Sequence, residues 1–228
     1  MKISNNFKIA KIDYKYMLER GYSQKSILKI IGDRYMLTGY ERTMLYRGVT
    51  TDEKANYRLN KKANPDEIKN NDLYIDGYNV LITISSYLKG SLVFIGNDGF
   101  LRDASEIHGK KLRKDYFDKS ILLLLDYLKN LEIKNVYFLF DTPVNNSGRL
   151  CQEINNLLIK KNIKGDAKTT KSPDFILKNI NKGYCATSDS AIIDVSKTKI
   201  FDLSFFTIKY FYNPIFFNIN ELHNNYNL

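Results

Sequence analysis

The sequence predicts an α/β protein, with a small all-helical module ahead of a mostly parallel sheet flanked by helices. Two observations support this fold class. Over residues 1–70, apolar residues recur at three- and four-residue spacings, which is typical of α-helices. Over residues 71–228, short apolar strands alternate with helical segments, and such crossover connections require parallel strands covered on both faces. We therefore expect a domain in each of these two ranges.

The first part of the chain predicts three short helices. Phe7, Ala10 and Tyr14 fall on one apolar stripe of the first helix. Thr38, with Glu41 three residues later, has the spacing of a capping box at the start of the third helix. Helices of these lengths are compatible with a helix-turn-helix-like module. The polar stretch that follows predicts a late helix or a linker before a boundary near residue 70.

The second part predicts strands separated by helices. A hairpin is expected around the turn at residues 97–99, because Asn-Asp-Gly favours a tight turn. Ser147 is expected to cap the helix that follows the central strand. The predicted strands cover residues 73–75, 91–96, 135–140, a short piece around 163, 184–187 and 198–203.

The bulk composition excludes several classes of protein. No apolar run approaches the roughly 18 residues of a membrane span. The N-terminus has no hydrophobic signal core, and we expect a cytoplasmic protein with no membrane partner. The two cysteines and two histidines do not have zinc-ligand spacing, and no Gly-rich phosphate loop ends in Lys-Ser/Thr.

The net charge is +10, and most of the excess lies in the first part. Residues 1–70 hold 15 Lys and Arg against 8 Asp and Glu, and the remaining residues hold 20 against 17. A basic module beside a nearly balanced domain suggests a polyanionic partner, although a lysine-rich composition by itself produces the same charge. The arginines could instead tie the module to the second domain through acidic partners. The basic stretch that contains Lys110 and Lys111 could be an ordinary solvated face. The candidate phosphate contacts are Arg34, Arg42, Arg47, Arg58, Lys110 and Lys111.

Four aspartates finish four separate predicted strands: Asp76, Asp141, Asp189 and Asp202. The carboxyl ends of parallel strands lie at one edge of a sheet, so these side chains are expected to converge. Crowded carboxylates repel one another, and Mg²⁺ or Mn²⁺ relieves that repulsion because both ions prefer oxygen ligands. A bound ion would also activate water for attack on a phosphodiester. The pattern therefore predicts a metal centre made by these four residues.

A second interpretation of the same acids stays open. Each aspartate could simply cap the helix that follows its strand. The occurrence of an aspartate at the end of four separate strands favours the metal site. Gly77 is expected to let the chain turn away from the strand without a side chain obstructing the site. The auxiliary candidates at this site are Asn79, Asp103, Ser147, Ser188 and Asp194.

Several motifs together resemble a known family. They are "IGDRYMLTGYERTMLYRG", "YIDGYNVLITISSYLKG", "NDGFLRDASEIHG", "FLFDTPVNNSG" and "ATSDSAIID". This set resembles the mostly archaeal family called domain of unknown function 434, whose members carry a companion domain numbered 5616. The resemblance runs from about residue 5 to about residue 205 and implies relatives rather than an activity.

The motifs "IDGYN" and "TSDSAIID" also look like the acidic motifs of PIN and NYN ribonuclease domains. That resemblance implies a compact α/β fold that cuts RNA with Mg²⁺ or Mn²⁺. Asp76 would be the first-motif ligand and Asn79 its polar neighbour, while Asp189 and Asp141 would be the later acids. The sequence departs from the pattern on the middle helix, where only Asp126 is available.

Taken with this resemblance, the sequence predicts a metal-dependent nuclease with Asp76, Asp141 and Asp189 as catalytic residues. The expected partner is nucleic acid, with RNA favoured over DNA. Two alternatives remain, a non-catalytic nucleic-acid-binding or scaffold protein on a degenerate PIN-like fold, and a phosphoesterase acting on a small phosphate.

Overall fold

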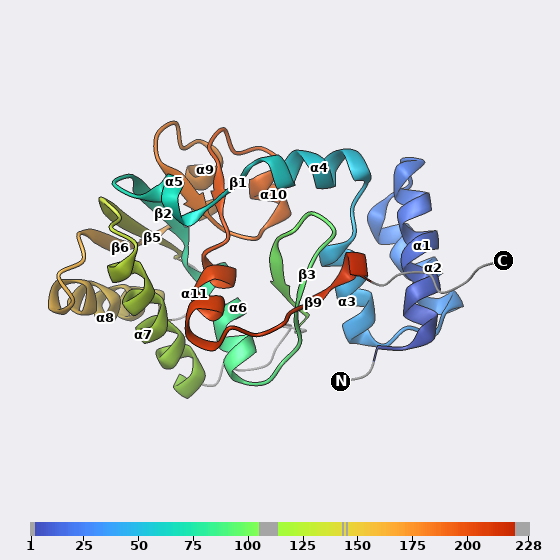
Figure 1. Ribbon diagram of the computed structural model, residues 1–228, viewed down its shortest axis with the longest axis horizontal. Coiled ribbons are helices and arrows are strands. Elements are labelled where there is room, and N and C mark those ends of the chain that lie inside the picture. Colours follow the sequence, from blue (N-terminus) through green and yellow to red (C-terminus); the bar gives the residue numbers. More distant parts are fainter. Residues whose placement is uncertain (1–2, 105–113, 143, 145, 222–228) are drawn as a thin grey trace.

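The computed structural model describes residues 3–104, 114–142, 144 and 146–221. A group of helices at the N-terminus lies beside an α/β part (Figure 1). In chain order the elements are α1 (Asn5–Glu19), α2 (Gln24–Arg34), α3 (Gly39–Gly48), α4 (Asp52–Asn60), β1 (Lys62–Ala63), α5 (Pro65–Ile68), β2 (Asp72–Asp76), α6 (Gly77–Leu88), β3 (Val93–Ile95), β4 (Leu101–Asp103), α7 (Lys114–Asn130), β5 (Asn135–Asp141), α8 (Ser147–Lys160), β6 (Gly165–Thr170), α9 (Pro173–Lys178), β7 (Tyr184–Ala186), α10 (Ser190–Ile193), β8 (Ile200–Phe201), α11 (Leu203–Tyr212), β9 (Phe217–Asn218) and the 3₁₀ helix η1 (Ile219–Glu221).

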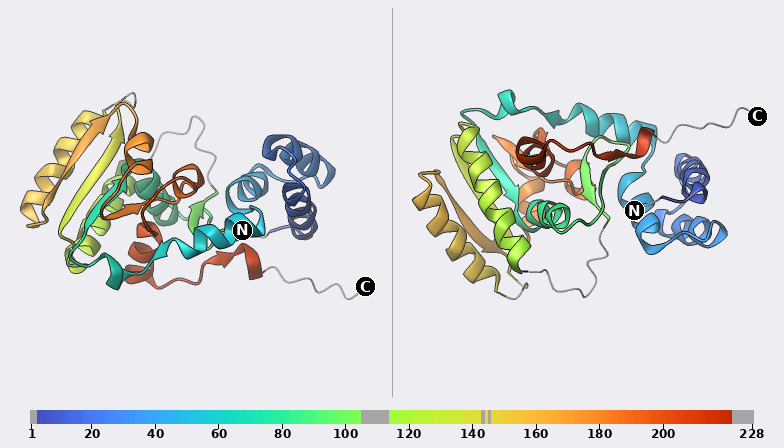
Figure 2. Two further views of the ribbon diagram at one scale, coloured as in Figure 1. Left: turned by 90° about the horizontal axis from the view of Figure 1, so that it is seen from above. Right: turned by 60° about the horizontal axis from the view of Figure 1, so that its bottom comes forward.

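The N-terminal helices α1, α2 and α3 share one apolar core. Phe7, Ala10 and Tyr14 are fully buried there, which confirms the stripe predicted on the first helix. The capping box of Thr38 and Glu41 is also present at the start of α3. The polar stretch after α3 forms α4 rather than an open linker. Figure 2 shows from two further sides that α1–α3 lie at one end of the molecule, opposite α8.

The main sheet has six strands in the order β1-β8-β7-β2-β5-β6, and every neighbouring pair is parallel. This confirms the predicted class, a parallel sheet flanked by helices and preceded by a helical module. β2 is central, between β5 and β7, so its carboxyl end at Asp76 lies in the middle of the sheet edge. Because β1 pairs with β8, the chain enters this sheet before the boundary expected near residue 70.

Side chains alternate across the sheet, so both of its faces are buried. In β5, Val136, Phe138 and Phe140 pack with α6, α7, α8 and α11, while Leu139 packs with α9 and α10 on the opposite face. This two-sided burial explains why the sequence of β5 is a continuous apolar run rather than an alternation of apolar and polar residues. Cys151 and Cys185 are both buried, and both thiols are free.

A second, three-stranded sheet connects the two parts. β3 and β4 form the predicted antiparallel hairpin, and β9 adds to β3 as a parallel strand that the sequence did not predict. Phe94 of β3 and Ile219 of η1 are both fully buried in the core of the N-terminal helices. The hairpin therefore packs the helical module onto the α/β part.

Two local predictions need correction. The strand expected around residue 163 runs instead from Gly165 to Thr170. The N-cap of α8 is Asn146, in the left-handed conformation at φ 66°, and Ser147 is the first residue of the helix. No helix in the part of the chain that the structure describes is both long and apolar enough to cross a bilayer.

Candidate functional site

Asp76 ends the central strand β2 and also caps helix α6, which begins at the next residue. One carboxylate oxygen accepts a hydrogen bond from the backbone N–H of Asn79 at 3.4 Å. The other accepts from the hydroxyl of Thr187 at 2.8 Å. Thr187 follows β7, so two neighbouring strands fix this carboxyl group at the edge of the sheet.

Burial raises the pKa of Asp76 to about 7. The hydrogen bond from Thr187 opposes this rise, and the negative charges of Asp189 and Asp174 add to it. Asp141, at the end of β5, has its pKa raised by burial and then by Asp174. The charges of Asp174 and Asp189 therefore act on Asp76, and the charge of Asp174 also acts on Asp141. We call Asp76, Asp141, Asp174 and Asp189 the acidic edge.

Two members of this environment were missed by the sequence analysis. Asp174 lies in the first turn of α9, just beyond β6. It was overlooked because β6 was predicted too early in the chain, around residue 163, which left Asp174 far beyond the expected end of that strand. Thr187 could be found only from its contact with Asp76, because a hydroxyl after a strand is common in loops.

Asp202 and Asp194, two of the predicted site residues, do not join the acidic edge. Asp202 is 1% exposed and pairs with Lys62 at 3.2 Å, while its oxygens accept from the N–H groups of Leu101 and Phe205. Asp194 binds Arg58 through both carboxylate oxygens, at 2.6 and 2.8 Å. The cap interpretation applies to Asp202, which caps α11 and in addition pairs with Lys62. It also applies to the backbone contacts of Asp76 and Asp189, whose carboxylates cap α6 and α10.

Among the auxiliary candidates, Asn79 and Ser188 contact each other directly. Asn79 Oδ1 accepts from the backbone N–H of Ser188 at 2.9 Å and from its hydroxyl at 3.0 Å. Ser147 is buried and bonds to the carbonyl of Thr142 at 3.5 Å, away from this pair. Asp103 pairs with Arg47 at 2.6 Å. Asn79 and Ser188 therefore brace the edge, whereas Ser147 does not contact them.

A buried ion cluster lies behind the acidic edge. Asp98 is 1% exposed and binds Arg58 and Arg102, which are 6% and 4% exposed. Arg102 also donates from Nε to the carbonyl of Ser188 at 3.1 Å. The cluster thus connects α4, the hairpin and the loop that carries Asp189.

The predicted exposed face of arginines is wrong for Arg58, because its guanidinium is buried between Asp98 and Asp194. The alternative interpretation holds for Arg58 and for Arg47, since both tie the helices to acids of the α/β part. Arg42 pairs with Asp33 inside the module. Of the remaining candidates, Arg34 is exposed beside the Tyr35 ring, and Lys110 and Lys111 lie outside the described residues.

A polar pocket of about 290 Å³ lies where the helical module meets the acidic edge. We call it the junction pocket. Its lining includes Gln24, Tyr46 and Arg47 from the module, and Asn79, Ser188 and Asp189 from the α/β part.

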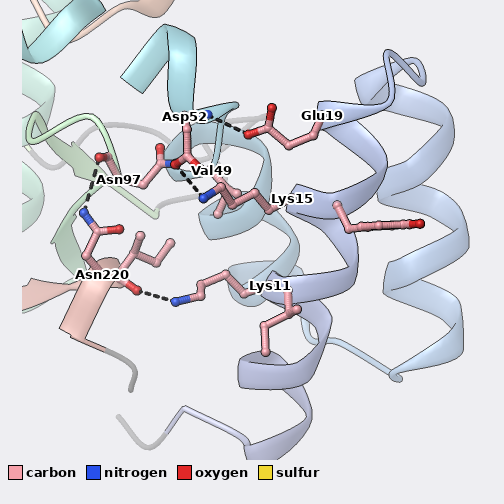
Figure 3. Close-up of a pocket in the computed structure, with 10 residues that line it drawn as sticks. Lys11, Lys15, Glu19, Val49, Asp52, Asn97 and Asn220 are labelled. Atoms are coloured by element: carbon pink, nitrogen blue, oxygen red, sulfur yellow. Dashed lines mark hydrogen bonds and ion pairs between the residues drawn. The ribbon is translucent and has the colours of Figure 1, made fainter. Parts of the chain in front are cut away.

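A larger pocket of about 390 Å³ lies between α1 and η1 (Figure 3). Its polar groups bind one another: Lys15 pairs with Asp52 at 2.6 Å, and Lys11 donates to the carbonyl of Ile219 at 3.0 Å. It contains none of the predicted site residues. The junction pocket, which Asp189 lines, is therefore the better candidate for the site.

The acidic edge fits a hard cation in its donor chemistry, because every charged group in it is a carboxylate. Within the residues that the structure describes, no three His, Cys, Asp or Glu side chains form a ready-made metal-binding group. Mg²⁺, however, typically takes one or two carboxylates and keeps several waters. Asp76 and Asp189 are two carboxylates close enough for the charge of one to act on the other.

Comparisons with known proteins match two family models to consecutive stretches of the chain. A family model described as a protein of unknown function, DUF434, matches residues 6–61, and one described as a domain of unknown function, DUF5616, matches residues 65–205. The chain is 35% identical over 202 residues to an uncharacterized protein of Methanocaldococcus jannaschii, covering 88% of this chain and 96% of that protein. No solved structure matches.

Proposed function

The chain belongs to the family that these two models define, DUF434 followed by DUF5616, and we propose that it is a metal-dependent nuclease that cuts RNA. One observation carries the proposal: Asp76 ends the central strand of the parallel sheet, at the edge where Asp189 caps α10, and burial followed by the charges of Asp189 and Asp174 raises the pKa of Asp76 to about 7. Carboxyl groups kept together despite their repulsion are typical of functional sites. A cation would relieve that repulsion.

Asp76 and Asp189 would hold Mg²⁺ or Mn²⁺, with Asp141 and Asp174 contributing further negative charge. When bound, such an ion supplies a water of lowered pKa and stabilises charge on a phosphodiester oxygen. The chain's own groups orient the site. Thr187 holds one carboxylate oxygen of Asp76, and the guanidinium of Arg47, beside Asp189 in the junction pocket, is available to bind a backbone phosphate.

The test is isothermal titration of Mn²⁺ together with a cleavage assay on labelled RNA, comparing wild type with Asp76→Asn. We expect the variant to lose both metal binding and cleavage. The matched control is Asp72→Asn, at the opposite end of the same strand, where the carboxylate accepts from Asn135 at 2.7 Å. The control is expected to bind Mn²⁺ as wild type does. Binding and cleavage that survive in Asp76→Asn would refute the proposed nuclease.

A second candidate function is a non-catalytic nucleic-acid-binding or scaffold protein. The observation in its favour is that three of the six predicted acids serve structural roles. Asp202, Asp194 and Asp103 are held by Lys62, Arg58 and Arg47. This candidate predicts salt-sensitive RNA binding without cleavage, and binding that is unchanged in Asp76→Asn.

A further inference from the structure

The junction pocket is built by both parts of the chain. Gln24 comes from the start of α2, and Tyr46 and Arg47 come from α3. The opposite wall carries Ser188 and Asp189 from the loop after β7. Asp189 belongs to the acidic edge, so a molecule in this pocket would touch the helical module and lie beside the proposed cleavage site at once.

Arg47 is held in the pocket wall rather than free in solvent. Its Nη1 donates to the carboxylate of Asp103 at 2.6 Å and to the carbonyl of Asp103 at 3.0 Å. The side chain is still 37% exposed, while that of Asp103 is 6% exposed. Both bonds use the same nitrogen, so the planar group can present Nε and Nη2 to a phosphate as a pair of donors.

Tyr46 supplies an aromatic surface next to this cation. The residue is 42% exposed. Its backbone is fixed because the amide of Gln24 donates to the carbonyl of Tyr46 at 2.7 Å, which ties the start of α2 to α3. An exposed ring that lines the same pocket as a guanidinium is the combination on which unstacked nucleobases bind, since every base has a π-face.

The size of the pocket limits the ligand. Its volume of about 290 Å³ lies at the small end of sites for small molecules, which span roughly 300–1,000 Å³. One nucleotide matches this scale, and a duplex does not. A base in a duplex is stacked on its neighbours, so only an unpaired strand can offer a base to Tyr46.

We infer that the junction pocket binds one nucleotide of single-stranded RNA, with Arg47 contacting its phosphate and Tyr46 stacking on its base. The inference rests on the proposed nuclease and gives the helical module a defined role: it supplies the substrate-binding wall of the site.

The test is fluorescence anisotropy with a 12-nucleotide, fluorescein-labelled oligouridine in EDTA, where metal-dependent cleavage is stopped. Tyr46→Ala and Arg47→Ala are each expected to weaken binding on the order of tenfold. Tyr46→Phe keeps the ring and is expected to bind like wild type, while Arg47→Lys loses the paired donors and is expected to bind more weakly. A fully paired RNA duplex of the same length is expected to compete poorly.

Arg20→Ala and Tyr16→Ala provide the matched controls. The guanidinium of Arg20 lies 4.6 Å from the centre of the Tyr16 ring, so the two form another arginine–tyrosine pair on the same module, outside the junction pocket. These variants are expected to change affinity less than twofold. Thermal melting of every variant separates lost binding from lost folding.

Equal losses of affinity in the pocket variants and the controls would refute nucleotide binding in the junction pocket, because they would indicate diffuse charge attraction. Unchanged affinity in Tyr46→Ala and Arg47→Ala, with RNA cleavage retained, would also overturn it and leave the nuclease standing. Selective loss of affinity in those variants, with no Mn²⁺-dependent cleavage by wild type, would support the pocket and overturn the nuclease.

Discussion

The side-chain oxygen of Asn79 accepts two hydrogen bonds from Ser188, one from its backbone N–H at 2.9 Å and one from its hydroxyl at 3.0 Å. Asn79 lies three residues after Asp76, and Ser188 precedes Asp189 directly. This pair therefore joins the start of α6 to the loop after β7 and fixes the spacing of two carboxylates of the acidic edge.

Removing this acceptor should loosen the site and the fold. Asn79→Ala leaves the buried N–H of Ser188 unpaired, so we expect a loss of about 1–3 kcal/mol in the free energy of unfolding, measured with urea. Asn130→Ala is the control, because Asn130 donates to the carbonyl of Asp126 on an exposed helix surface. Its expected cost is below about 0.5 kcal/mol. Equal costs for the two variants would contradict the bracing role of Asn79.

The raised pKa of Asp76 predicts a pH dependence of stability. An unfolded aspartate loses its proton near pH 3.8, whereas folded Asp76 keeps it to about pH 7. Between these values the folded state binds more protons, so stability falls as the pH rises through that window. From pH 5 to pH 8, the contribution of Asp76 to the free energy of unfolding decreases by on the order of 2–3 kcal/mol.

Asp76→Asn has no titrating group at this position. Its free energy of unfolding should therefore not show this decrease between pH 5 and pH 8. Urea unfolding of wild type and variant at pH 5 and pH 8, without divalent metal, measures the difference. The variant should gain stability relative to wild type at the higher pH. A stability difference between the two proteins that does not change with pH would rule out the raised pKa.

The buried ion cluster should be sensitive to the loss of its acid. Asp98→Asn leaves Arg58 and Arg102 facing each other with less neutralising charge in the protein interior, and such losses cost about 3–5 kcal/mol. The control is Asp33→Asn, which breaks the exposed Arg42–Asp33 pair, where the expected cost is below about 1 kcal/mol. Chemical denaturation compares the two, and a small cost for Asp98→Asn would show that the cluster relaxes or takes up water.

Gly77 is required by packing. A Cβ at this position would lie 2.3 Å from Cε1 of the Phe140 ring. Gly77→Ala should therefore displace Phe140 and cost about 1–3 kcal/mol. At Gly148, near the start of α8, an added Cβ would meet nothing within 4 Å. Gly148→Ala should be neutral or stabilising by up to about 1 kcal/mol, since alanine favours helix. Thermal melting distinguishes the two, and a harmless Gly77→Ala would contradict the close packing.

Gly77 indicates why some features could be predicted and others could not. The sequence predicted that the residue after Asp76 lets the chain turn without an obstructing side chain, and the structure adds that Phe140 occupies the space a side chain would need. The contact with Phe140 joins residues far apart in the chain, and no local pattern records such a contact. The same limit applies to Arg58, whose spacing on α4 suggests a solvated face, although Asp98 and Asp194 bury it.

The sequence by itself determined the fold class, because helical and strand periodicities are local properties of the chain. It also determined that Asp76, Asp141 and Asp189 lie at one edge, because parallel strands must end on the same side. Only the tertiary structure decided which acids belong together. It added Asp174, assigned Asp202 and Asp194 to buried ion pairs, and brought Arg47 of the helical module beside Asp189. These choices depend on contacts between distant segments, where burial and charge pairing outweigh local sequence preference.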